Sequence, residues 1–254
     1  MITVISPAKK LDYESQVCTE EFTIPEGLDR SALLINKLQK TSNKKIGELM
    51  DLSQNLVELN AERYANWTED FTEGETRQAL LAFSGDVYQG MKNNELTASE
   101  VQFAQDHLRI LSGLHGLLRP LDLIKPYRLE MGTKLSVRGK KDLYAFWGDE
   151  ITNRLNTALE ASGNNTLVNL ASGEYFKAVN TKKLKGKIVT PVFKDMKNGQ
   201  LKVIFLWAKQ ARGMMSGYIL RNRINNAEDL KAFSDGGYRF TEELSDETTW
   251  VFTR

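Results

Sequence analysis

Helical and strand-like patterns alternate along the whole chain, and no segment rich in proline, glycine and serine separates one part from another. Ile2–Ile5 is a run of mostly β-branched residues that ends at Ser6 and Pro7, which predicts a buried strand followed by a turn. Thr249–Phe252 is again strand-like. This alternation favours one mixed α/β domain over residues 1–254, in which helices surround a mixed sheet.

Helical spacing is clearest in the first half of the chain. Apolar residues recur every three or four positions in Ser31–Trp67, which predicts two or three helices there. Thr72 with Glu75 and Thr97 with Glu100 both match a capping box, in which the two side chains satisfy each other's backbone amides. The second pair precedes apolar residues on one helical face, so it predicts a helix that starts at Thr97.

The second half of the chain combines strands with a further helix. Three apolar or alternating runs predict strands at Leu167–Leu170, Ile188–Phe193 and Leu201–Trp207. A turn at Lys197–Gly199 predicts that the last two form a hairpin. Ala208–Ile224 has helical spacing again, and Gly213 and Gly217 within it would let another backbone or a ligand approach closely.

The segment HLRILSGLHGLLRPLDLIKPYRLEMG, from His107 to Gly132, places two glycines between leucine-rich stretches. Its simplest interpretation is a helix, a tight turn and a second helix, as in a helix-hairpin-helix, where backbone amides at the turn bind a phosphate. An ordinary connection between two packed helices is the alternative, since the glycine spacing is one residue wider than in the usual signature. The glycines and arginines concerned are Gly113, Gly116, Arg109, Arg119 and Arg128.

Positive charge is concentrated between Glu174 and Glu228, a segment that we call the basic window. Asp195 is its single acidic residue, whereas the formal net charge of the whole chain is only +1. Segregated charge of this kind can form a surface that attracts polyanions such as nucleic acid. The alternative is a lysine-rich face that only favours solubility. The cationic residues of the basic window are Lys177, Lys182, Lys183, Lys185, Lys187, Lys194, Lys197, Lys202, Lys209, Arg212, Arg221 and Arg223.

Lys9 follows the predicted strand at the N-terminus. Ligands of α/β sheets bind at the carboxyl ends of strands, so Lys9 is a candidate anion contact, with a solvated loop lysine as the alternative. Ser6 and Lys9 also match the Ser-x-x-Lys pattern of serine acyl-enzymes, but no Lys-Thr-Gly triplet accompanies them, and acyl transfer is not predicted. The candidate DNA- or phosphate-binding residues are therefore Lys9, Arg109, Gly113, Gly116, Arg119, Arg128, Lys209 and Arg212.

The sequence assigns no catalytic residue, and we predict neither a metal nor a cofactor. The two histidines are eight residues apart without a metal-binding pattern, and one cysteine excludes an internal disulfide and a thiolate zinc cage. Four carboxylates near glycines and aromatic residues could form a site, or could cap helices and pair with arginines. These residues are His107, His115, Cys18, Asp86, Glu130, Asp142 and Asp149.

Cellular location is expected to be the cytoplasm. No run approaches the ~20 apolar residues of a membrane-spanning helix, so no membrane contact is predicted. The first ten residues have no signal-peptide pattern, and a single cysteine fits a reducing compartment. We further expect the protein to be a monomer.

Seven segments, in order, resemble the blocks of the YaaA family of peroxide stress proteins, and together they span nearly the whole chain. The resemblance implies a cytosolic protein of the hydrogen peroxide response that limits intracellular iron and oxidative DNA damage and binds DNA. It also implies a single mixed α/β domain with a basic cleft and a helix-hairpin-helix. The segments are SPAKKLDY, AFSGDVYQG, HLRILSGLHGLLRPLDLIKPYRLEMG, DLYAFWGDEITNRLN, VNLASGEYFKAV, PVFKD and AKQARGMMSGYI.

Three functions are consistent with these features. The first is a stress protein that holds double-stranded or distorted DNA through its phosphates, largely independently of sequence, and it predicts that Arg119→Glu or Arg212→Glu weakens binding. The second is an enzyme that acts on a nucleotide or another phosphorylated small molecule in the same basic cleft. The third is an interaction protein whose basic face binds an acidic partner.

Overall fold

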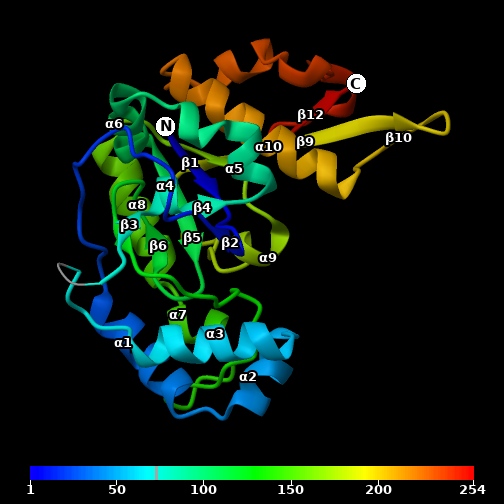
Figure 1. Cartoon of the computed structure of the whole chain (residues 1–254). Helices are drawn as coiled ribbons and strands as arrows, with labels where there is room; N and C mark the ends of the chain where they lie inside the picture. Colours follow the sequence, from blue (N-terminus) through cyan, green and yellow to red (C-terminus); the bar gives the residue numbers. More distant parts are fainter. Residues whose placement is uncertain (72–73) are drawn as a thin grey trace.

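The computed structural model describes residues 1–71 and 74–254 and is built on one large sheet (Figure 1). The strand order is β11-β12-β9-β8-β1-β5-β6, and β10 is attached to β9. Helices surround this sheet, so the predicted mixed α/β fold is confirmed. The strands are β1 (Ile2–Ile5), β5 (Leu108–Ser112), β6 (Gly116–Leu118), β8 (Thr166–Asn169), β9 (Lys187–Lys197), β10 (Gln200–Lys202), β11 (Arg239–Phe240) and β12 (Thr249–Thr253).

The middle of the sheet is parallel and its margins are antiparallel. Thr3 of β1 lies opposite Leu108 of β5 on one side and Val168 of β8 on the other, in parallel register. All four residues of β1 are buried, which confirms the predicted N-terminal strand. Since the chain leads from β1 to a neighbour on one side and later returns on the other, the carboxyl end of β1 is a topological switch point.

The helices largely follow the sequence patterns. Three of them occupy the region predicted to hold two or three, and Thr97 forms a complete capping box with Glu100. Thr72 lies outside the described residues. None of the helices in the described ranges is both long and apolar enough to cross a membrane. The α-helices are α1 (Leu28–Gln39), α2 (Asn43–Met50), α3 (Gln54–Ala65), α4 (Ala79–Ala82), α5 (Asp86–Met91), α6 (Ala98–His107), α7 (Leu143–Trp147), α8 (Glu150–Ala161), α9 (Gly173–Phe176) and α10 (Phe205–Arg221).

Short strands and 3₁₀ helices complete the fold. Two small two-stranded sheets pair β2 with β4 and β3 with β7. The predicted hairpin between β9 and β10 is confirmed, but its second strand is shorter than expected, because α10 already begins at Phe205. These elements are β2 (Lys10–Leu11), β3 (Arg77–Gln78), β4 (Phe83–Ser84), β7 (Leu123–Ile124), η1 (Asn93–Glu95), η2 (Ala227–Ala232), η3 (Asp235–Gly237) and η4 (Glu242–Leu244).

The predicted helix-hairpin-helix between His107 and Gly132 is wrong. The segment forms the β-hairpin of β5 and β6, in which Ser112 pairs with Gly116. A Cβ at Gly113 would lie 2.2 Å from the carbonyl oxygen of Leu129, and one at Gly116 would lie 2.8 Å from the ring of Trp147. The two glycines therefore fit the turn against its protein neighbours instead of facing a phosphate. A helical hairpin is present elsewhere, where α2 and α3 are joined by a short turn.

The glycines of α10 permit close contact with α5, as the sequence predicted for another backbone. A Cβ at Gly213 would lie 1.9 Å from the carbonyl oxygen of Val87, and one at Gly217 would lie 2.8 Å from that of Met91. On the other helix, Gly90 similarly faces the carbonyl of Gln210 at 2.2 Å. This contact fixes the position of α10 relative to the start of α5.

Gly213→Ala is expected to lower the free energy of unfolding by ~2 kcal/mol, because the two helices must separate to admit the methyl group. Urea denaturation followed by circular dichroism measures this change. Gly173→Ala is the matched control, since an added Cβ there meets no atom within 4 Å. Equal stability of the two variants would contradict the close helix contact.

Candidate functional site

A cavity of about 670 Å³ lies at the switch point of the sheet. The loops that follow β1 and β8 form its base, and the starts of α5 and α10 contribute to its walls. The hydroxyl of Ser6 accepts a hydrogen bond of 2.9 Å from the backbone amide of Ser172, and the carbonyl of Ser6 accepts one of 3.1 Å from Tyr88. The first bond joins the two loops, the second joins the β1 loop to α5, and together they fix the backbone that leads to Lys9.

Four of the predicted cationic residues line this cavity: Lys9, Arg128, Lys209 and Arg212. Lys209 and Arg212 lie on one face of α10, three residues apart, as predicted. The ammonium of Lys209 lies 3.5 Å from a carboxylate oxygen of Asp86. The structure therefore brings together four of the eight residues predicted from the sequence to bind DNA or phosphate.

Arg212 differs from the other three cations because its guanidinium has no partner among the described residues. The side chain is half-buried, and burial lowers the pKa of Arg212. An arginine remains protonated at neutral pH even so. Arg212 thus presents a desolvated positive charge to the cavity without a carboxylate to neutralise it, which makes it the strongest candidate for binding an anion.

Glu130 supplies a negative charge to the same cavity. One of its oxygens, Oε1, accepts from Lys9 at 3.2 Å and from Arg128 at 3.1 Å. Its other oxygen, Oε2, is buried and has no hydrogen-bond partner among the described residues. Lys9 and Arg128 are therefore partly neutralised, while the second carboxylate oxygen of Glu130 is buried without a donor among the described residues.

The four carboxylates that the sequence singled out separate into two groups. Asp86 and Glu130 both line the cavity. Asp142 accepts a hydrogen bond from the backbone amide of Ala145 and so caps α7. Asp149 pairs with Lys183 at 2.6 Å. Only the first two can take part in chemistry at this site.

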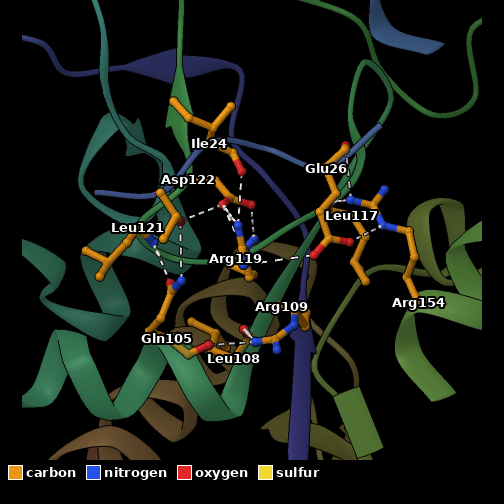
Figure 2. A network of polar contacts seen from close by, with 11 residues as sticks. Ile24, Glu26, Gln105, Leu108, Arg109, Leu117, Arg119, Leu121, Asp122 and Arg154 are labelled. Carbon is orange, nitrogen blue, oxygen red and sulfur yellow. Dashed lines mark hydrogen bonds and ion pairs between the residues drawn. The ribbon is translucent and has the colours of Figure 1, made fainter. Parts of the chain in front are cut away.

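Arg109 and Arg119 do not line the cavity, so the candidate phosphate-binding residues do not all meet in one basic cleft. Both arginines lie beside a second hollow of about 190 Å³, towards the amino-terminal end of β5. Figure 2 shows Arg119 directed at Asp122, which it contacts at 2.9 Å. Arg109 donates to the backbone carbonyls of Gln105 and Leu108 at 2.8 and 2.7 Å.

Buried carboxylate and carbonyl partners therefore use much of the hydrogen-bonding capacity of these two arginines. Arg119 also donates to the carbonyl of Ile24 at 3.0 Å, and Glu26 lies 3.9 Å from it. Ile24 and Glu26 are distant in sequence from Arg119, and local patterns carry no signal for them. The expected loss of DNA binding in Arg119→Glu consequently loses its geometric basis.

Asp195, the single acidic residue of the basic window, is turned into the protein. Its exposed fraction is 1%, and it accepts hydrogen bonds from Tyr238 at 3.0 and 3.1 Å and contacts Arg254. Its charge is therefore kept away from the lysines of the surface. The exposed cations of the window are Lys177, Lys182, Lys183, Lys185, Lys187, Lys197, Lys202, Arg221 and Arg223.

Few cations of the basic window are neutralised by carboxylates. Among the described residues, only Lys183 and Lys209 of this window make an ion pair. Part of the window forms the arm of β9 and β10, which extends away from the rest of the structure (Figure 1). The expected concentration of positive surface charge in this part of the chain is thus supported by burial and pairing.

Phe205 is a cavity residue that the sequence interpretation missed. It lines the cavity at the start of α10, and 74% of it is exposed. Its spacing from Lys209 and Arg212 was a signal, since residues at i, i+4 and i+7 share a helical face. The interpretation of Leu201–Trp207 as a strand concealed this relationship.

The histidines do not contribute to the cavity. His107 stacks on Phe103 with ring centroids 4.2 Å apart. His115 is fully buried, and burial lowers its pKa to about 3, so the ring is neutral. No group of three or more His, Cys, Asp or Glu residues in the described ranges is arranged to hold a metal ion.

Comparison with known proteins places the chain in a family. Residues 1–244 match the family described as peroxide stress protein YaaA. The chain belongs to the YaaA family. A UPF0246 protein of Ralstonia nicotianae is 54% identical over 254 residues, which cover 100% of this chain and 99% of the relative. A UPF0246 protein of Aliivibrio fischeri is also 54% identical over 254 residues, covering 100% of this chain and 98% of the relative.

Membership of the YaaA family supports a role in the hydrogen peroxide stress response. Several of the segments through which the sequence resembles the YaaA family meet at the cavity. SPAKKLDY supplies Ser6 and Lys9, AFSGDVYQG supplies Asp86, and AKQARGMMSGYI supplies Lys209 and Arg212. The family resemblance and the geometry thus point to the same part of the molecule.

Proposed function

We propose that this member of the YaaA family binds double-stranded or distorted DNA through its phosphates, and in this way helps to limit intracellular iron and oxidative DNA damage during peroxide stress. The main support is the half-buried guanidinium of Arg212, which faces the cavity without an anionic partner among the described residues. A phosphate oxygen there would receive charge-assisted hydrogen bonds in a partly desolvated position.

Lys209 lies on the same face of α10 as Arg212, and Lys197 and Lys202 add exposed positive charge on the arm of β9 and β10. Lysines that do not pair with carboxylates attract DNA over about a Debye length and release counterions when a phosphate binds. Such contacts carry no base information, so binding is expected to be largely independent of sequence.

An enzyme acting on a nucleotide or another phosphorylated small molecule is the second candidate. The volume of the cavity, about 670 Å³, falls within the range of roughly 300 to 1,000 Å³ that is typical of small-molecule sites. The cavity also contains two carboxylates, Asp86 and Glu130, which a groove serving only as a phosphate track would not need.

Salt dependence tests the first candidate. If about four phosphates are neutralised on binding, the logarithm of the association constant should fall against the logarithm of salt concentration with a slope near ~3.6 in magnitude. A gel shift with duplex, bubble and single-stranded probes at several salt concentrations measures this slope. A flat response would reject DNA binding, and thermal stabilisation by mononucleotides alone would favour the enzyme.

A further inference from the structure

One face of α10 presents an aromatic ring, an ammonium and a guanidinium to the cavity in succession. These groups belong to Phe205, Lys209 and Arg212, which stand at i, i+4 and i+7 and all line the cavity. With a rise of 1.5 Å per residue, Phe205 and Arg212 are about 10 Å apart along the helix axis. An elongated ligand can therefore contact both ends of this face.

Phe205 is unusual for a large apolar side chain, because 74% of it is exposed. Within the described residues its ring stacks on no other aromatic ring, and the ammonium of Lys209 lies 4.3 Å from the ring centroid. Exposed aromatic rings beside positive charges are the platforms on which proteins stack nucleobases, since every base has a flat π-face.

The carboxylate of Glu130 restricts which ligands the cavity can bind. Glu130 and Asp86, which both line the cavity, favour a ligand that carries hydrogen-bond donors as well as a phosphate. The buried Oε2 of Glu130 lacks a donor among the described residues. A nucleotide meets both requirements of the cavity. Its phosphate can bind the cations, and its N–H or O–H groups can donate to a carboxylate.

We infer that the cavity accepts a single nucleotide, with its phosphate on Arg212, its base stacked on Phe205 and a donor of its base or sugar directed at Glu130. The inference rests on the proposed function and deepens it. The nucleotide has two sources, a free nucleoside monophosphate or an unpaired nucleotide of DNA, which must leave the stack to enter a cavity of this size.

Isothermal titration of the full chain with adenosine monophosphate and with inorganic phosphate tests the inference. Adenosine monophosphate is expected to bind about tenfold more tightly than phosphate, because stacking on Phe205 adds to the phosphate contacts. Phe205→Ala should remove this tenfold difference, whereas Phe205→Trp should retain it. Leu206→Ala is the matched control, since Leu206 is exposed on the same turn of α10 but does not line the cavity.

Competition experiments distinguish the two sources. If adenosine monophosphate displaces a labelled duplex that contains one unpaired nucleotide, the cavity takes its nucleotide from DNA. If it binds without displacing that DNA, the ligand is the free nucleotide. Equal affinities for adenosine monophosphate and phosphate, or an unchanged difference in Phe205→Ala, would overturn the inference. Salt-dependent duplex binding measured in parallel would then still stand, so the two failures can be told apart.

Discussion

Arg212→Glu is expected to weaken binding of duplex DNA by about a hundredfold at moderate salt. The substitution removes a charge-assisted contact and places a carboxylate beside Asp86 and Glu130, where a phosphate would have to approach three negative groups. A hundredfold loss corresponds to ~2.7 kcal/mol of binding free energy. Fluorescence anisotropy with a labelled duplex measures the dissociation constant directly.

The matched control for Arg212→Glu is Lys141→Glu. It makes the same change in net charge at an exposed lysine that does not line the cavity. The control should lose less than about threefold in affinity, because an exposed charge at a distance is screened by salt. A similar loss in both variants would show that the affinity for DNA depends only on net charge. The cavity would then not be the site of phosphate binding.

Asp195→Ala is expected to lower the free energy of unfolding by ~4 kcal/mol. Asp195 is buried and is the shared partner of Tyr238 and Arg254, so its removal leaves a hydroxyl and a guanidinium without their acceptor. A loss of this size lowers the melting temperature of a chain of 254 residues by about 10 °C. Urea and thermal denaturation measure the two quantities.

Glu243→Ala is the control for Asp195→Ala, since it removes an exposed carboxylate from the same region of the chain. We expect it to change stability by less than ~0.5 kcal/mol. If Asp195→Ala were equally mild, the buried cluster would not hold this part of the fold together.

The parts of the fold that sequence predicted well carry local signals. The capping box at Thr97 satisfies amides within its own first turn, and β1 is a short apolar run bounded by Ser6 and Pro7. Gly213 indicates a close approach from its place inside a helical pattern, although α5, which approaches it, is far away in the chain. The capping box and β1 are thus decided by neighbouring residues, whereas the partner of Gly213 is not.

The β5–β6 hairpin could not be recognised in the same way. Leu108, Ile110 and Leu111 are all buried, because β5 lies inside the sheet and is covered on both faces. A strand of this kind has no alternation, and a leucine-rich run is compatible with helical and strand periods alike. The two glycines then suggested a helical turn, although their neighbours, Leu129 and Trp147, decide their positions.

The candidate site was predicted only in part for a related reason. Lys9 could be assigned to the carboxyl end of a strand, and Lys209 and Arg212 to one helical face, from the sequence alone. Whether an arginine is free or paired depends partly on residues far away in the chain. Arg119 is held by Asp122, three residues away, and by the distant carbonyl of Ile24, whereas Arg212 has no such partner among the described residues.

A crystal structure of the chain bound to a short DNA duplex would locate the bound phosphates directly. We expect a phosphate oxygen within hydrogen-bond distance of the Arg212 guanidinium, in the cavity at the carboxyl end of β1. Phosphates bound instead around Arg109 and Arg119, with the guanidinium of Arg212 in contact with solvent alone, would contradict DNA binding at this cavity.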